Sequence, residues 1–276
     1  MTTPETSTNP GTAASETRRL RLARRLLDGA GLGSLVAYRH DPDADLLVLA
    51  HALTRRGDLV VVCTVEALTS ALGEEVVGDR HDVRLDLHRE AATADVRILV
   101  SSLHLLGRVE WVSIAEQRRL VACGELPEPA RDAAWSDRNR VGRVCADRVV
   151  LHDSEGVAAW SFEVVATTPP DPSPWAHRSL EAVDAVMSVD QHALAGLCRD
   201  VSDGRARGRV LARRPVGAAL AAGRRVHCLD ADASGVTLLH VDGDTETVVF
   251  AGFPEPVAEP ATVGSGLGPL LPRSRS

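Results

Sequence analysis

The stretch Thr167-Thr168-Pro169-Pro170-Asp171-Pro172-Ser173-Pro174 separates two parts of the sequence whose residue patterns predict different secondary structure. Four of its last six residues are proline. Proline fixes its own φ angle and has no amide proton, so such a run favours a stiff, extended connection. The sequence therefore predicts two domains, residues 15–166 and 175–260, joined by a proline-rich linker at 167–174.

The part before the linker consists mainly of short apolar runs separated by turn-forming residues. A first helix is expected to begin at Ser15, and shorter helices at 65–72 and 114–123. Many short strands with few helices are typical of a small antiparallel barrel, whose closure removes exposed sheet edges. The expected strands are 34–38, 46–50, 59–64, 83–87, 96–101, 105–112, 141–146, 148–151 and 157–160.

The part after the linker starts with helical periodicity and ends with strands. Helices are expected at 175–187 and 189–199. Strands follow at 208–212, 225–229, 236–241 and 245–250, and the turn Asp242-Gly243-Asp244 predicts a hairpin. The fold class is therefore α+β, an antiparallel barrel followed by a small α/β domain with two helices and a short antiparallel sheet. The terminal segments 1–14 and 261–276 are expected to be disordered.

Composition excludes several classes of function. All 31 basic residues are arginine, so lysine chemistry such as a Schiff base, a pyridoxal-phosphate anchor or a P-loop lysine is impossible. A net charge of −7 argues against nucleic acid or an anionic membrane as partner. Five scattered cysteines predict reduced thiols in a cytoplasmic protein, and no apolar run is long enough for a membrane span.

The sequence contains few residues in catalytic or metal-binding patterns. Neither G-x-S-x-G nor H-E-x-x-H occurs, and Cys63 in an apolar run is expected to be a core residue. The ten histidines have no metal-ligand spacing. His227 and Cys228 are adjacent but lack a third ligand nearby, so no metal site is predicted. Binding is therefore favoured over catalysis.

Two arginine clusters are candidate sites for anions, because arginine binds carboxylates and phosphates bidentately. The first is the helix face formed by Arg18, Arg19, Arg21, Arg24 and Arg25, which is either a solvated surface or a docking site for an acidic protein. The second cluster is Arg138, Arg140 and Arg143, which is a candidate for a cofactor phosphate or a haem propionate.

Two stretches of the second domain resemble a known family. Met187-Ser188-Val189-Asp190-Gln191-His192-Ala193-Leu194 resembles the Met-Asn-x-Asp-His motif of the small C-terminal α/β domain of haem-utilisation (HugZ-like) proteins, which are similar to pyridoxamine-phosphate oxidases. Phe250-Ala251-Gly252-Phe253-Pro254-Glu255-Pro256-Val257 resembles the Phe-Pro-x-Pro-Val turn of that domain. Upstream, residues 83–87 and 104–111 resemble strands of the preceding split barrel.

The resemblance implies an FMN-binding-like split barrel, a connection to haem or FMN, and a homodimer formed through the barrel. His192 and His227 are the candidate haem ligands, together with the second arginine cluster. The sequence departs from the motif, because the family's histidine falls on Gln191 and its asparagine on Ser188. The expected function is a non-catalytic haem-, flavin- or protein-binding module. The alternatives are a flavin-dependent oxidoreductase or haem-degrading enzyme, and a regulatory protein that docks through the Arg18–Arg25 helix.

Overall fold

The computed structural model describes residues 10–73, 80–93, 96–172, 175, 178–217, 220 and 226–271. The chain forms two compact units. The first contains the chain up to His88, Ser102–Leu151 and Ala158–Pro170, and the second contains Arg89–Ser101, His152–Val157 and the chain from Asp171. One division thus falls inside the proline-rich stretch. The assignment of 89–101 and 152–157 to the second unit is a feature that the sequence does not predict.

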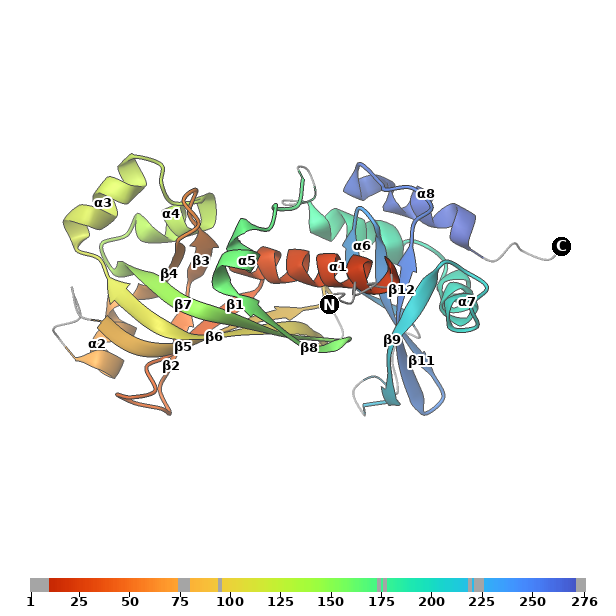
Figure 1. Cartoon of the computed structure of the whole chain (residues 1–276), viewed down its shortest axis with the longest axis horizontal. Coiled ribbons are helices and arrows are strands. Elements are labelled where there is room, and N and C mark those ends of the chain that lie inside the picture. The colour runs from red at the N-terminus through yellow and green to blue at the C-terminus, as the bar shows by residue number, and fades with distance from the viewer. Residues whose placement is uncertain are drawn as a thin grey trace, which may run out of the picture. The chain divides into compact units, whose positions relative to one another are not determined.

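The first unit is built on a strongly curled antiparallel sheet, which is consistent with a split barrel (Figure 1). Its strands follow the order β2-β1-β5-β6-β7-β4-β3, and β8 pairs with β7. The bounds are β1 Leu32–Val36, β2 Asp45–Val48, β3 Ala50–Leu53, β4 Leu59–Thr64, β5 Arg80–Glu90, β6 Leu99–Trp111, β7 Asn139–Asp153 and β8 Gly156–Ser161.

Two pairs of expected strands are single long strands. The expected strands 96–101 and 105–112 are replaced by β6, which begins only at Leu99 and ends at Trp111, and 141–146 and 148–151 both lie in β7. At the junction of the two expected segments in β6, Ser102 and His104 lie on the outer face of a continuous strand and do not interrupt it. Gly107 of β6 allows the two strands to approach closely, because a Cβ there would lie 2.2 Å from the carbonyl oxygen of Cys145.

Helix α1 (Pro10–Leu27) packs on the core of the curled sheet beside α5 (Phe162–Thr167). Leu22, Leu26 and Leu27 are buried in this core with Cys63, which confirms the prediction that Cys63 is a core residue. The helix begins five residues before the expected start, so Ser15 is not its cap, and the prediction of disorder at 10–14 is wrong. The apolar stripe predicted the helix, but the signal for its start was missed: Pro10, a residue favoured at the first helical position, stands at its first residue and follows Asn9 in the sequence.

A second apolar cluster lies on the other face of β4 and β7. Val60, Val62 and Val141 pack there against Leu120 of α3 (Ile114–Ala122) and Ala130 of α4 (Glu128–Ala134). Helix α2 (Val65–Leu72) begins directly after β4 and is capped by the Thr64 hydroxyl, which accepts from the amide of Ala67. The expected helices at 65–72 and 114–123 are confirmed, whereas α4 and α5 are additions.

The second unit contains a four-stranded antiparallel sheet in the order β10-β11-β12-β9. Its bounds are β9 Gly208–Pro215, β10 Val226–Asp232, β11 Gly235–Asp242 and β12 Thr245–Gly252. Helices α6 (Ser179–Met187) and α7 (Gln191–Ser202) share a core with one face of this sheet, including Val186, Leu194 and Leu238. Asp242 pairs with Thr245, which confirms the predicted hairpin.

The opposite face of that sheet is covered by chain from the first half of the sequence. Ala91 and Ile98 pack against Leu229, Leu239 and Val248. At one end of this contact, Arg89 Nη2 lies 2.8 Å from Asp230 Oδ1, and both side chains are largely buried. The small sheet is therefore enclosed on both faces within its own unit.

The prediction of disorder after residue 260 is wrong for the described part of the tail. Residues 260–270 form the short helices η1 (Pro260–Thr262), α8 (Val263–Leu267) and η2 (Gly268–Leu270). Val263 and Leu267 are fully buried in the core of the second unit. The predicted tails at 1–9 and 272–276 lie outside the described residues. None of the helices that the structure describes is long and apolar enough to cross a membrane.

Candidate functional site

The two histidines predicted as ligands, His192 and His227, are not brought together. His192 is exposed in the first turn of α7, where its amide donates to the capping carboxylate of Asp190. His227 is buried on β10 opposite Leu239, and Leu239 belongs to the face of the sheet that packs on Ala91 and Ile98. Helix α7 packs on the other face, so the sheet separates the two imidazoles.

The arginines of the second predicted cluster, Arg138, Arg140 and Arg143, also do not lie together. Arg138 is exposed just before β7, and Arg140 is only 9% exposed. Arg143 lies three residues after Arg140, so the two point to opposite faces of the strand. The Arg143 guanidinium is paired with the Glu116 carboxylate at 2.9 Å. Together with Arg119, Arg143 lowers the pKa of Glu116 to about 2. The structure therefore does not form one anion site from these three residues.

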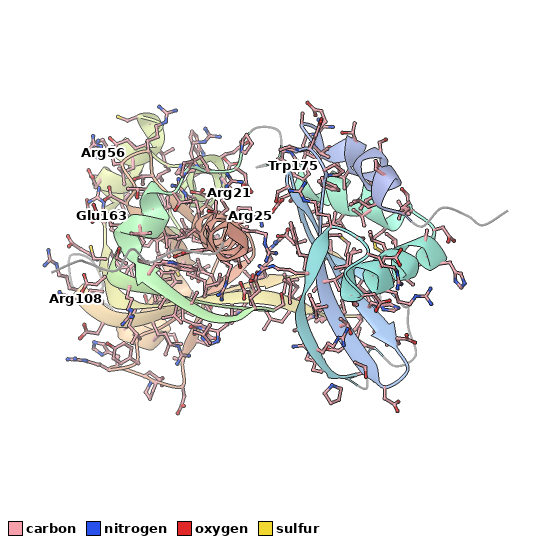
Figure 2. The ribbon with its side chains drawn as sticks, turned by 45° about the vertical axis from the view of Figure 1, so that its right-hand side comes forward. Arg21, Arg25, Arg56, Arg108, Glu163 and Trp175 are labelled. Atoms are coloured by element: carbon pink, nitrogen blue, oxygen red, sulfur yellow. The ribbon has the colours of Figure 1, made fainter. Side chains whose placement is uncertain are left out.

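The arginines of α1 have different roles. Figure 2 labels Arg21 and Arg25 on this helix, and Glu163 on the neighbouring α5. Arg24, between them in sequence, is part of the fold: its Nη1 donates to the carbonyl oxygens of Ala166 and Thr168, the latter at 2.8 Å. These carbonyls lie at the end of α5, where a cation is favourable. Arg21 is exposed.

A polar cluster that the sequence analysis did not predict lies on the outer face of β5 and β6. His104 Nδ1 is 2.6 Å from Asp86 Oδ1, and Ser102 Oγ is 3.1 Å from His104 Nε2. The second carboxylate oxygen of Asp86 accepts from Arg84 Nε at 2.7 Å. We call Arg84, Asp86, Ser102 and His104 the outer-face cluster.

Strand alternation explains why these side chains meet. Every second residue of β5 and β6 points into the core of the curled sheet; those residues are Leu85, Leu87, Leu103 and Leu105. The residues between them therefore point outward. Because β5 and β6 are neighbours in the sheet, Asp86 of one strand reaches His104 of the other.

The hydrogen bonds of the cluster indicate which ring nitrogen of neutral His104 carries the proton. A carboxylate only accepts, so Nδ1 must carry the proton that bonds Asp86. Nε2 of the neutral ring then has the lone pair, to which the Ser102 hydroxyl donates. Asp86 is nearly buried, whereas 35% of the His104 side chain is exposed. The cluster thus presents His104 Nε2 near the surface, on a ring oriented by a buried carboxylate.

Apolar side chains surround the cluster on the same face. Leu106 follows His104 by two residues and is 65% exposed. Leu32 pairs with His88, whose ring lies 6.0 Å from that of His104, and Leu32 is also 65% exposed. Leu47 pairs with Ser34, which in turn pairs with Asp86. Exposed leucines on three strands therefore lie on the same face of the sheet as the hydrogen-bonded histidine.

Cysteine does not provide an alternative reactive group within the two cores. Burial raises the pKa values of Cys63, Cys198 and Cys228 to about 12, so these thiols stay protonated near neutral pH. Cys228 points into the core shared with α7, away from the face that carries His227. In the described ranges, no group of three or more His, Cys, Asp or Glu side chains is arranged to hold a metal ion.

The sequence contained a signal for the outer-face cluster. In Arg84-Leu85-Asp86-Leu87-His88 and in Ser102-Leu103-His104-Leu105, polar residues alternate with leucine. This alternation, which has a period of two residues, predicts one polar face on each strand. Finding the site also required knowing that these strands are neighbours and how they are aligned, and His104 was expected to precede a strand.

Comparison with known proteins gives no family. No family model and no curated protein matches the chain. Among solved structures, a haem-binding protein from Mycobacterium smegmatis is 14% identical and has a TM-score of 0.44, and the match covers 91% of this chain and 95% of that one. A protein of unknown function from Agrobacterium tumefaciens str. C58 is 14% identical over 98% of this chain and 99% of that one, with a TM-score of 0.36.

A third structure, a putative general stress protein 26 from Jannaschia sp. CCS1, is 13% identical with a TM-score of 0.31 and covers 51% of this chain and 81% of that one. At these levels of likeness, the ligands of the neighbours are not transferred to this chain.

Proposed function

We propose that the chain is a haem-binding module in which His104 is the iron ligand. One observation carries the proposal: His104 is partly exposed, and its Nδ1 donates to the buried carboxylate of Asp86 at 2.6 Å. Histidines that ligate metals commonly donate their other ring nitrogen to a carboxylate, which fixes the tautomer and makes the ligand more basic. The outer-face cluster already has this arrangement.

The surroundings of His104 fit a haem. The macrocycle is flat and apolar, and Leu32, Leu47 and Leu106 expose apolar surface on the same face of the sheet. Haem propionates need cations at the rim. Arg84 lies within the outer-face cluster, and Arg108, labelled in Figure 2, is exposed four residues beyond His104 on the same strand. These residues would hold the group, and bound haem would supply an iron centre.

The chain's own residues contribute binding and orientation. Asp86 holds the imidazole in place, and Arg84 holds Asp86 through its second carboxylate oxygen. For haem to bind, the Ser102 hydroxyl must leave Nε2, since both use the same lone pair. Flavin is the weaker candidate, because Arg138, Arg140 and Arg143 do not converge on one phosphate position.

Titration with haemin tests the proposal. We expect a saturable, shifted Soret band with the full chain, and at least tenfold weaker binding for His104→Ala. His192→Ala is the matched control, since that exposed histidine was the sequence-based candidate. Loss of the band in His192→Ala but not in His104→Ala would overturn the assignment. Absence of any Soret shift, with quenching of flavin mononucleotide fluorescence instead, would favour the flavin alternative.

A further inference from the structure

We propose that Ser102, His104 and Asp86 form a nucleophile, base and orienting group that accept an acyl group from a small activated ester. This activity goes beyond haem binding, because it uses Ser102 and proceeds in protein without haem. The sequence shows no nucleophile motif, and the tertiary structure alone brings the three side chains together.

The distances fit this role. Ser102 Oγ lies 3.1 Å from His104 Nε2, and His104 Nδ1 lies 2.6 Å from Asp86 Oδ1. Both values are in the range expected between a nucleophile and its base, and between a base and its orienting group. Such sets are recognised by geometry and roles, and not by the order of residues in the chain.

The three side chains are held by rigid elements. Ser102 and His104 are two residues apart on β6, so they lie on the same face of one strand. Asp86 on β5 is nearly buried, and Arg84 holds its second oxygen at 2.7 Å. The arrangement therefore does not depend on a loop, which favours a preorganised site.

The chemical step is an ordinary acyl transfer. Ser102 Oγ attacks the acyl carbon while its proton passes to His104 Nε2, and the resulting imidazolium is stabilised by Asp86. The bond between the acyl carbon and the leaving oxygen breaks, and the leaving group takes the proton from Nε2. Water then attacks the acyl-serine with His104 again as base, which releases the acid and restores Ser102.

The surroundings indicate the class of substrate. Ser102 is only 7% exposed, so the acyl group must be small. Leu32 and Leu106 expose apolar surface nearby, which suits an aromatic leaving group. His88, whose ring lies 6.0 Å from that of His104, is a candidate donor to the oxyanion. An aryl acetate combines these features.

The absence of lysine simplifies a labelling experiment that tests the proposal. With no lysine in the chain, aryl acetates and fluorophosphonates meet no lysine amines that would compete for the reagent. Cys123 and Cys145 are exposed thiols that an aryl acetate would also acylate, so the labelling reagent is a fluorophosphonate. The haem-free protein is treated with a fluorophosphonate, whose serine adduct is not hydrolysed as the acetyl-serine is, and the modified residue is located by peptide mass mapping. Turnover of p-nitrophenyl acetate is followed separately by the release of p-nitrophenol.

We expect one phosphonyl label, on Ser102, and none there in Ser102→Ala. Labelling should be at least tenfold slower in His104→Gln and in Asp86→Asn. The neighbouring Ser101→Ala is the matched control and should label at the normal rate, with circular dichroism showing that each variant is folded. A label on another residue, or equal rates in Ser102→Ala and the unmodified chain, would overturn the proposal.

The two proposals fail in different ways. Haem and acyl transfer compete for the lone pair of His104 Nε2, so haemin should block labelling of Ser102. Ser102→Ala should lose the label but keep the Soret shift, whereas His104→Gln should lose the Soret shift and label at least tenfold more slowly. Labelling without any Soret shift would remove haem binding alone, and a Soret shift without labelling would remove the acyl transfer alone.

Discussion

At the scale of single residues, the protonation of His51 opposes folding. This side chain is buried on β3, and its Nε2 donates to the carbonyl oxygen of Leu26 at 2.7 Å. Burial lowers the pKa of His51, and the hydrogen bond to Leu26 offsets only part of that effect. The folded chain therefore keeps the neutral ring at pH values where the unfolded chain takes up a proton.

Stability should consequently fall as the pH falls below about 6.5, the ordinary pKa of histidine. Because His51 takes up at most one proton, it changes the unfolding free energy by at most about 1.4 kcal/mol per pH unit. We expect His51→Gln to flatten the pH dependence of the unfolding free energy, measured by urea denaturation between pH 7.5 and 5.5. His192→Gln changes an exposed histidine and should keep the original slope. An unchanged slope in His51→Gln would contradict the assignment.

At the scale of elements, the contact between α1 and α5 depends on one arginine of the basic helix. Arg24 donates to two carbonyls at the end of α5 and pairs with Asp28 at 2.7 Å, whereas Arg21 is exposed. Hydrogen bonds to charged groups contribute about 1.5–3 kcal/mol, and exposed substitutions change stability by less than about 0.5 kcal/mol.

Arg24→Gln should therefore destabilise the first unit by about 1.5–3 kcal/mol in chemical denaturation, and Arg21→Gln should be nearly neutral. Equal effects of the two substitutions would contradict the structural role of Arg24.

The structural role of Arg24 also limits how the hypothesis that α1 docks on an acidic protein can be tested. Charge reversal at Arg24 would damage the fold, so Arg21 is the position at which a pull-down tests docking.

At the scale of the whole molecule, the second unit is not a continuous piece of sequence. Leu229, Leu239 and Val248 are covered by Ala91 and Ile98, and Asp230 is paired with Arg89. A fragment of residues 171–276 lacks these partners, and removal of one member of a buried ion pair is strongly destabilising.

We expect the 171–276 fragment to bind the dye ANS strongly and to elute from size-exclusion chromatography as aggregates or as an expanded species. The full chain at the same concentration is the comparison and should show neither property. A compact, monomeric fragment with low ANS fluorescence would show that the segments 89–101 and 152–157 are dispensable for the second unit.

The sequence determined the elements whose signal is local. The apolar period of α1, the run of Leu59–Thr64 and the hairpin at Asp242 and Thr245 all appear where neighbouring residues predict them. The absence of lysine is likewise a property of the sequence alone, and it excludes lysine chemistry whatever the fold.

Only the tertiary structure decided which side chains meet. His192 and His227 are candidates by residue type, yet they lie on opposite sides of a sheet. Asp86, Ser102 and His104 form hydrogen bonds because β5 and β6 are neighbours with one particular alignment. A shift of one residue would turn one strand's polar side chains toward the core. Strand alignment is set by the packing of the whole sheet, so no local pattern could have placed this site.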